Sequence, residues 1–129
     1  GRKDTAGKAF INGKWIEVSK GKKEDGEEKA LIKTSSNGIL EVDLHATALL
    51  ETTVGMDNTA ILKYQMEKFN EAMKAVLRKK GLRIVFIHGK GDGVLRKAIL
   101  TELKTKYPAC RWQDASFKEY GYGATMVTV

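Results

Sequence analysis

The chain has few of the residues that cross-link, break or anchor a polypeptide. Its 129 residues include one cysteine, one proline and two histidines, and 8% are aromatic. A single cysteine excludes an internal disulfide framework and favours a reducing compartment, so we expect a cytoplasmic protein. Cys110 falls in an expected strand, where we interpret it as a buried, inert thiol. No apolar run approaches the ~20 residues that cross a bilayer, and no secretory signal is visible, so we expect no membrane partner.

Positive charge, by contrast, is abundant. The chain holds 23 Lys and Arg against 16 Asp and Glu, which gives a formal net charge of +7. A basic balance of this size favours polyanionic partners, with DNA or RNA foremost. The length fits one domain. Because the chain begins with Gly1 rather than Met, we expect it to belong to a longer protein with other domains.

Residues 1–37 read as a basic N-terminal arm that contains a hairpin and a flexible linker. Asn12 and Gly13 lie between two apolar runs, and Asn-Gly is a strong hairpin signal. A lone hairpin is marginal in water. We therefore expect it to dock on the domain, to pair with residues 30–32, or to be the edge of a preceding domain. Residues 19–29 are nearly all charged or glycine and are predicted to be mobile.

Residues 38–129 show an α/β pattern. Strand-like runs cover 39–44, 83–87, 111–117 and 124–129, and helical periodicity covers 58–80 and 94–107. Asp57 or Asn58 is expected to cap the first helix, Gly81 follows its end, and Pro108 stops the second helix. We predict a mixed four-stranded sheet with two long helices packed on it.

The most informative segment is residues 85–95, Val-Phe-Ile-His-Gly-Lys-Gly-Asp-Gly-Val-Leu. A strand ends in His88, a loop with three glycines follows, and a helix begins. Glycines let backbone N–H groups approach a ligand, and the helix N-terminus adds unpaired donors and a positive dipole end. This arrangement predicts a phosphate site. The predicted nucleic-acid contacts are Gly89, Lys90, Gly91, Gly93, Arg96 and Lys97.

The order of strands and helices predicts which residues lie beside this loop in space. A helix links the first two strands, so these strands should be parallel, with their carboxyl ends at one edge of the sheet. Ligands favour that edge in open α/β sheets. It would hold Asp43, His45 and His88 together. Three alternatives stay open: histidines that only bond backbone, an Asp43 that caps a turn, and a divalent metal site from all three, whose spacing matches no strong signature.

Three segments resemble the small MutS-related (Smr) family. Residues 42–45, Val-Asp-Leu-His, resemble the family's Leu-Asp-Leu-His motif. Residues 87–96 resemble its His-Gly-x-Gly or Thr-Gly-x-Gly motif, and residues 121–127 resemble its glycine-containing final strand. The resemblance covers about residues 38–129. It implies a two-layer βαβαββ sandwich similar to the C-terminal domain of bacterial translation initiation factor three. Ala46 stands where the family usually has glycine, and the connection through residue 56 is longer than usual.

The resemblance also implies nucleic-acid binding, with endonuclease activity on DNA or RNA in several members. Within the matching motifs, the site would be carried by Asp43, His45, His88, Gly89, Lys90 and Gly91. In the expected mechanism His45 or His88 transfers a proton, Lys90 stabilises charge on the phosphate, and Asp43 orients His45 or holds a divalent metal ion. The alternatives are a noncatalytic nucleic-acid-binding module and a protein-interaction module whose basic surface is incidental.

Overall fold

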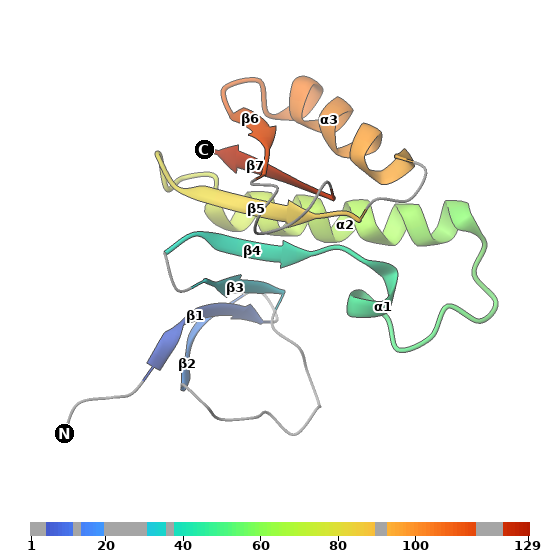
Figure 1. The fold of residues 1–129 in the computed structure, drawn as a ribbon, viewed down its shortest axis with the longest axis horizontal. Helices are drawn as coiled ribbons and strands as arrows, with labels where there is room; N and C mark the ends of the chain where they lie inside the picture. The colour runs from blue at the N-terminus through green and yellow to red at the C-terminus, as the bar shows by residue number, and fades with distance from the viewer. Residues whose placement is uncertain (1–4, 12–13, 20–30, 36–37, 90–92, 116–122) are drawn as a thin grey trace.

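The computed structural model describes residues 5–11, 14–19, 31–35, 38–89, 93–115 and 123–129. The elements follow the order β1 (Thr5–Ile11), β2 (Lys14–Ser19), β3 (Ile32–Thr34), β4 (Leu40–Asp43), α1 (Ala46–Leu49), α2 (Asn58–Val76), β5 (Arg83–Ile87), α3 (Val94–Lys106), β6 (Arg111–Asp114) and β7 (Ala124–Thr128). The strands form one sheet of seven in the order β2-β1-β3-β4-β5-β7-β6 (Figure 1).

The sheet is mixed, as predicted. β4 and β5 are parallel, with Asp43 beside Ile87, and the other neighbouring strands are antiparallel. The arrowheads of β4 and β5 therefore point to the same end of the molecule in Figure 1. This parallel pair brings the two histidine-bearing segments to one sheet edge, which confirms the topological prediction.

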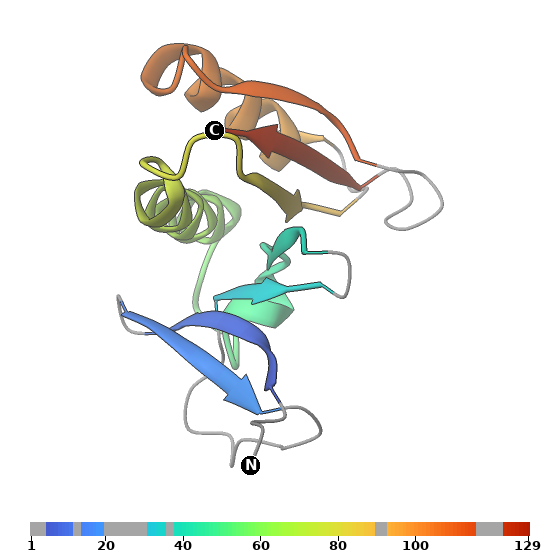
Figure 2. The same ribbon diagram turned by 90° about the vertical axis from the view of Figure 1, so that its left-hand side faces the viewer.

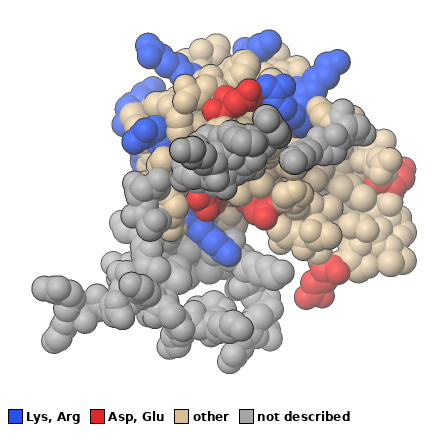
Figure 3. Space-filling model, viewed as in Figure 1, with Lys and Arg blue, Asp and Glu red and all other residues tan. Residues whose placement is uncertain are grey.

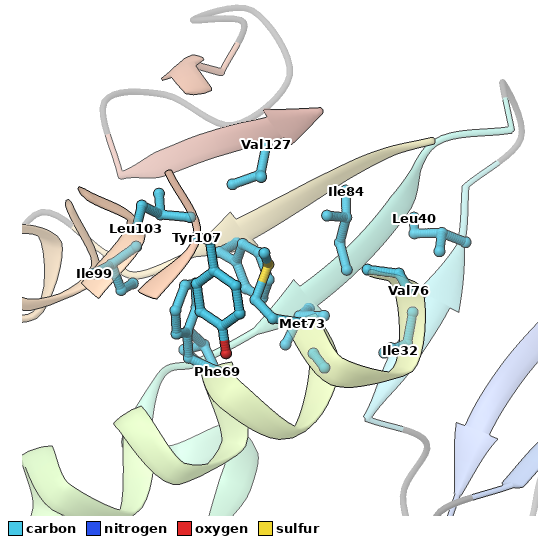
Figure 4. Close-up of a cluster of buried hydrophobic side chains, with 14 of the residues drawn as sticks. Ile32, Leu40, Phe69, Met73, Val76, Ile84, Ile99, Leu103, Tyr107 and Val127 are labelled. Carbon is cyan, nitrogen blue, oxygen red and sulfur yellow. The ribbon is translucent and has the colours of Figure 1, made fainter. Parts of the chain in front are cut away.

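Helices α2 and α3 cover one face of the sheet, as the end-on view shows (Figure 2). Their buried residues recur at helical spacing: Phe69, Ala72, Met73 and Val76 on α2, and Leu95, Ile99 and Leu103 on α3. They pack against buried strand residues whose side chains point to the same face of the sheet: Ile32, Leu40, Val42, Ile84, Phe86 and Val127 (Figure 4). The Phe69 and Phe86 rings lie 4.7 Å apart between centroids at the middle of this core. The two-layer α/β sandwich is thus confirmed.

One predicted element boundary is confirmed and three differ from the predictions. The Asp57 side chain caps α2 as expected, accepting from the Ala60 N–H at 2.8 Å. Regular helix ends at Val76 rather than near Lys80, because N–H groups at Lys79 and Leu82 bond three residues back and tighten the chain into turns. β6 ends at Asp114, and residues 116–117 of the longer predicted strand lie outside the described residues. Cys110 precedes β6 instead of lying in it, and it is half-buried.

The long connection after β4 contains α1, which was not predicted. This helix has four residues, none of them buried, so no apolar periodicity marks it in the sequence. Among the described residues, no helix is long and apolar enough to cross a membrane.

The N-terminal strands extend the sheet. β1 and β2 form an antiparallel pair, and the Asn12–Gly13 turn predicted between them lies outside the described residues. β1 also pairs with β3 through Phe10 and Ile32, which is the second of the three predicted alternatives for the hairpin. Mobility was predicted for residues 19–29. Ser19 is instead the last residue of β2, and residues 20–29 lie outside the described part of the chain. The division of the chain at residue 37 stays a prediction.

Candidate functional site

Asp43 and His45 form a hydrogen-bonded pair at the carboxyl end of β4. His45 Nδ1 lies 2.8 Å from Asp43 Oδ1, and the His45 backbone N–H donates to the same oxygen at 2.9 Å. A carboxylate only accepts, so Nδ1 carries the hydrogen and Nε2 is left as the basic nitrogen of a neutral ring. Both side chains are about half exposed, at 49% for Asp43 and 47% for His45. The pair is therefore oriented and open to a ligand.

The His45 ring lies directly over Gly89, the residue that follows His88. A Cβ at Gly89 would lie 2.5 Å from His45 Nε2, and Gly89 has a φ of +81°, which L side chains rarely adopt. Gly123 also lies directly against the Gly89 backbone, since a Cβ at Gly123 would lie 2.8 Å from the Gly89 Cα. The ring, the Gly89 backbone and the Gly123 backbone thus form three layers in contact, with no room for a side chain between them.

His88 lies beneath this surface and uses both ring nitrogens internally. Nδ1 is 3.0 Å from the Gly89 carbonyl oxygen, and Nε2 is 3.0 Å from Thr125 Oγ1 on β7. The carbonyl only accepts, so Nδ1 donates and the Thr125 hydroxyl donates to Nε2. Burial lowers the pKa of His88 below its ordinary value of 6.5; the Gly89 carbonyl opposes that effect, and the charge of Arg96 adds to it. His88 is thus held neutral and fixes the loop backbone.

The Gly123 carbonyl strengthens this fixation. It accepts the N–H groups of both His88 and Gly89, at 2.8 and 2.9 Å. On the opposite side, Gln65 Nε2 of α2 donates to the Leu44 carbonyl at 2.8 Å, between Asp43 and His45. The site is therefore built from β4, β5, β7 and α2, and each segment is tied to its neighbour by a hydrogen bond.

The predicted phosphate-binding residues fall into two groups. Lys90 and Gly91 lie outside the described residues. Gly93 is the N-cap of α3, with a φ of +82° and no side-chain cap, and the exposed Lys97 donates its N–H to the Gly93 carbonyl. Arg96 is held by Asp114 of β6 across 3.0 Å. The described positive side chains that were predicted to contact phosphate, Arg96 and Lys97, therefore lie in the first turn of α3. We call this turn the cationic side of the site.

Asp43, His45 and His88 do not form a metal centre. Among the described residues, no group of three or more His, Cys, Asp or Glu side chains is placed to hold a metal ion. Both nitrogens of His88 are engaged with protein atoms, and His45 Nδ1 faces Asp43. These three side chains do not fit as a ligand set for a divalent ion.

The sequence predicted part of this arrangement. The two-residue spacing of Asp43 and His45 favoured their pairing, because residues i and i+2 of a strand share a face. Three partners were missed: Thr125 for His88, Asp114 for Arg96, and Gln65 for the Leu44 carbonyl. All three come from other segments, where strand register or helix docking brings them close. The contact of Gly123 with the Gly89 backbone was also missed, since the sequence showed only that residues 121–127 contain glycine.

Chemically, the arrangement suits proton transfer beside a bound anion. The Asp43 carboxylate orients His45 through its Nδ1 hydrogen, as an aspartate does in a catalytic triad. Backbone N–H groups at a helix start favour a phosphate or carboxylate nearby. No nucleophilic serine or cysteine is among the residues that these contacts bring together. The arrangement fits acid–base chemistry on a substrate that brings its own nucleophile, such as water or a hydroxyl.

Comparisons with known proteins identify the family of the chain. Residues 55–129, which include β5, α3, β6 and β7, match the Smr domain family. The matched range leaves out Asp43 and His45. A protein described as endonuclease MutS2, from Finegoldia magna, is 31% identical over 101 residues, which cover 77% of this chain and 11% of that relative. No solved structure gives a significant match. On the family match and this relative together, the chain belongs to the Smr domain family.

Proposed function

We propose that this domain binds nucleic acid and hydrolyses a phosphodiester bond as a nicking endonuclease. The observation that carries the proposal is the exposed Asp43–His45 pair seated on the Gly89 backbone. The endonuclease named among its relatives supports the reaction class, and the chain corresponds to 11% of that relative, so other domains of a longer protein would deliver the substrate.

In this proposal each group has one task. The first turn of α3, with Lys97 and the predicted loop contacts of Lys90, holds a phosphate. His45 Nε2 takes a proton from the attacking water as its oxygen bonds to phosphorus and the P–O bond to the leaving nucleoside oxygen breaks, and that oxygen takes up a proton from solvent. Asp43 keeps the His45 ring oriented through Nδ1 during this step. His88 keeps the Gly89 peptide in place, and it does not exchange protons with the substrate, because its nitrogens already bond Gly89 and Thr125.

A nicking assay tests the proposal. Supercoiled plasmid DNA and labelled RNA are incubated with the purified chain, with several divalent ions and with chelator. Asp43→Asn and His45→Ala should each lower the cleavage rate by roughly 100-fold or more, because each removes part of the acid–base pair. Binding measured by fluorescence anisotropy should change little. Glu51→Gln is the matched control, since Glu51 is an exposed carboxylate in the connection that follows the site.

Two results would contradict the catalytic proposal. Cleavage that survives the Asp43/His45 double substitution would move the chemistry elsewhere. Binding without cleavage of any DNA or RNA substrate would favour the second candidate, a noncatalytic nucleic-acid-binding module. That candidate rests on the same cationic side of the site, at Arg96 and Lys97.

A further inference from the structure

A second concentration of positive charge lies at the opposite end of the sheet from Asp43 and His45. It consists of Lys80, Arg83, Lys106 and Arg111, all exposed, and we call it the cationic pole. Arg78 and Lys79 flank it in the turns after α2. Figure 3 shows Lys and Arg side chains at the upper left of the molecule, with others along its top and at the upper right.

Strand register holds two members of the pole together. Arg83 on β5 and Arg111 on β6 both pair with Thr128 of β7, which lies between them. The two arginines are therefore on one face of the sheet, two strand spacings or about 9.6 Å apart. Lys80 and Lys106 line one shallow hollow with Cys110 and Val129, so they border the same end of the sheet.

Little nearby charge offsets the pole. Lys106 pairs with Glu102 at 3.0 Å, and Lys79 lies 4.4 Å above the Trp15 ring. Within the described part of the chain, Lys80, Arg83 and Arg111 form no ion pair. Cations after α2 complement its dipole, but that explanation does not reach Arg83 and Arg111, which are on strands. Arginines at this spacing repel one another and favour an anion between them.

The pole and the candidate site share a sheet face. Arg83, Val85 and Ile87 share the side of β5 that faces away from the helices, and Asp43 pairs with Ile87. Val85 is only 1% exposed, so this face is covered between the pole and the site, and a bound strand would pass over that cover. Four residue steps separate the Arg83 row from the Asp43 row, which is about 13 Å. Each strand of a DNA duplex rises about 3.4 Å per nucleotide along the helix axis, so this separation corresponds to about four nucleotides of a duplex.

We propose that the cationic pole is a second binding surface for a phosphodiester backbone, which holds the nucleic acid about four nucleotides from the bond at the Asp43–His45 pair. This inference rests on the proposed function. The pole positions the polymer and takes no part in the chemistry, because it lies too far from His45 to touch the reacting phosphate. Its contacts are with phosphates, so it binds DNA and RNA of any sequence.

Salt-dependent binding tests the inference on the full chain. The affinity for a labelled 20-nucleotide DNA or RNA is measured from 50 to 200 mM KCl for the wild type and for Arg83→Gln/Arg111→Gln. The control is Lys63→Gln/Lys74→Gln, which removes two exposed charges from α2. Each lost phosphate contact lowers the slope of log K against log salt by about one unit, so the pole variant should lose about two and the control variant far less. Thermal unfolding shows that both variants stay folded.

The outcomes separate the two proposals. If pole and control variants show equal slopes while the wild type still binds, the pole is not a contact surface, and the proposed function stands. If the pole variant loses its slope while Asp43→Asn/His45→Ala keeps the wild-type slope, the pole is a binding surface distinct from the catalytic pair. If the wild type binds neither DNA nor RNA at 50 mM KCl, the proposed function and the pole are both overturned.

Discussion

At the scale of single residues, the two histidines have opposite environments. His45 is exposed and paired with a carboxylate, whereas His88 is buried and bonds a carbonyl and a hydroxyl. The sequence identified both as candidates for proton transfer, since each follows a strand. It could not distinguish them, because burial of His88 depends on Thr125, 37 residues further along.

This difference predicts a pH-dependent stability. The pKa of His88 is lowered by burial in the folded protein, so the unfolded chain binds a proton that the folded chain does not as pH falls below 6.5. The unfolding free energy should therefore decrease from about pH 7.5 to 5, with a limiting slope of about 1.4 kcal/mol per pH unit for one proton. His88 faces two cationic or titratable groups, Arg96 and His45, and one acid, Asp114, so its net surroundings do not favour protonation.

Urea unfolding across this pH range measures the effect. His88→Gln should be less stable at pH 7.5 and should lose this part of the pH dependence. His45→Gln serves as the exposed-histidine control and should keep it. An unchanged pH profile in His88→Gln would show that His88 is not the group responsible.

At the scale of helices and strands, the sequence predicted the elements with strong periodicity and missed those defined by contact. α2, α3, β4, β5 and β7 carry regular apolar spacing and were predicted within a few residues. α1 carries no buried residue and gave no signal. The sequence predicted only part of the close approach of β4, β5 and β7 at the site, because the residues at the point of contact are glycines.

Gly89 and Gly123 therefore give the sharpest prediction at this scale. Gly89→Ala should cost about 1–2 kcal/mol from its positive φ, and its methyl group should push the half-exposed His45 ring aside. Gly123→Ala should be at least as costly, since its methyl group meets the Gly89 backbone, which cannot rotate away. Both should also lower cleavage or binding by moving His45.

Gly81→Ala is the matched control. Gly81 has a φ of +86° with open space around its Cβ position, so it shares the backbone strain without the collision. Denaturant midpoints for the three variants separate the two effects. A Gly89→Ala protein that cleaves or binds as well as Gly81→Ala would mean that the His45 ring does not need to rest on Gly89.

At the scale of the whole molecule, the N-terminal strands β1, β2 and β3 belong to the same sheet as β4, β5, β6 and β7. Phe10 on β1 is buried in the same core as Ile32 and contacts the Trp15 ring at 5.5 Å between centroids. The sequence offered this pairing as one of three alternatives for the hairpin and could not choose among them, since a short antiparallel pairing such as Phe10 with Ile32 leaves no local pattern.

We expect Phe10→Ala to lower the unfolding free energy of the whole chain by about 3 kcal/mol, in one cooperative transition. Val54→Ala removes an apolar side chain that is 89% exposed, and it should change stability by less than about 0.5 kcal/mol. Circular dichroism and tryptophan fluorescence should report the same midpoint for each variant. A stability unaffected by Phe10→Ala would instead favour an independent N-terminal arm and a domain boundary near residue 37.

The candidate site is assembled from residues 43–45, 88–89 and 123–125, which lie on three strands and far apart along the chain. None of these segments holds the site alone: His45 needs the Gly89 backbone beneath it, and that backbone needs the Gly123 carbonyl. The strand pairings that unite them join residues far apart along the chain. The proposed chemistry therefore requires all three segments to be in place at once. A partly unfolded copy would hold the residues of the site without their arrangement, so we expect nicking only from the fully folded chain.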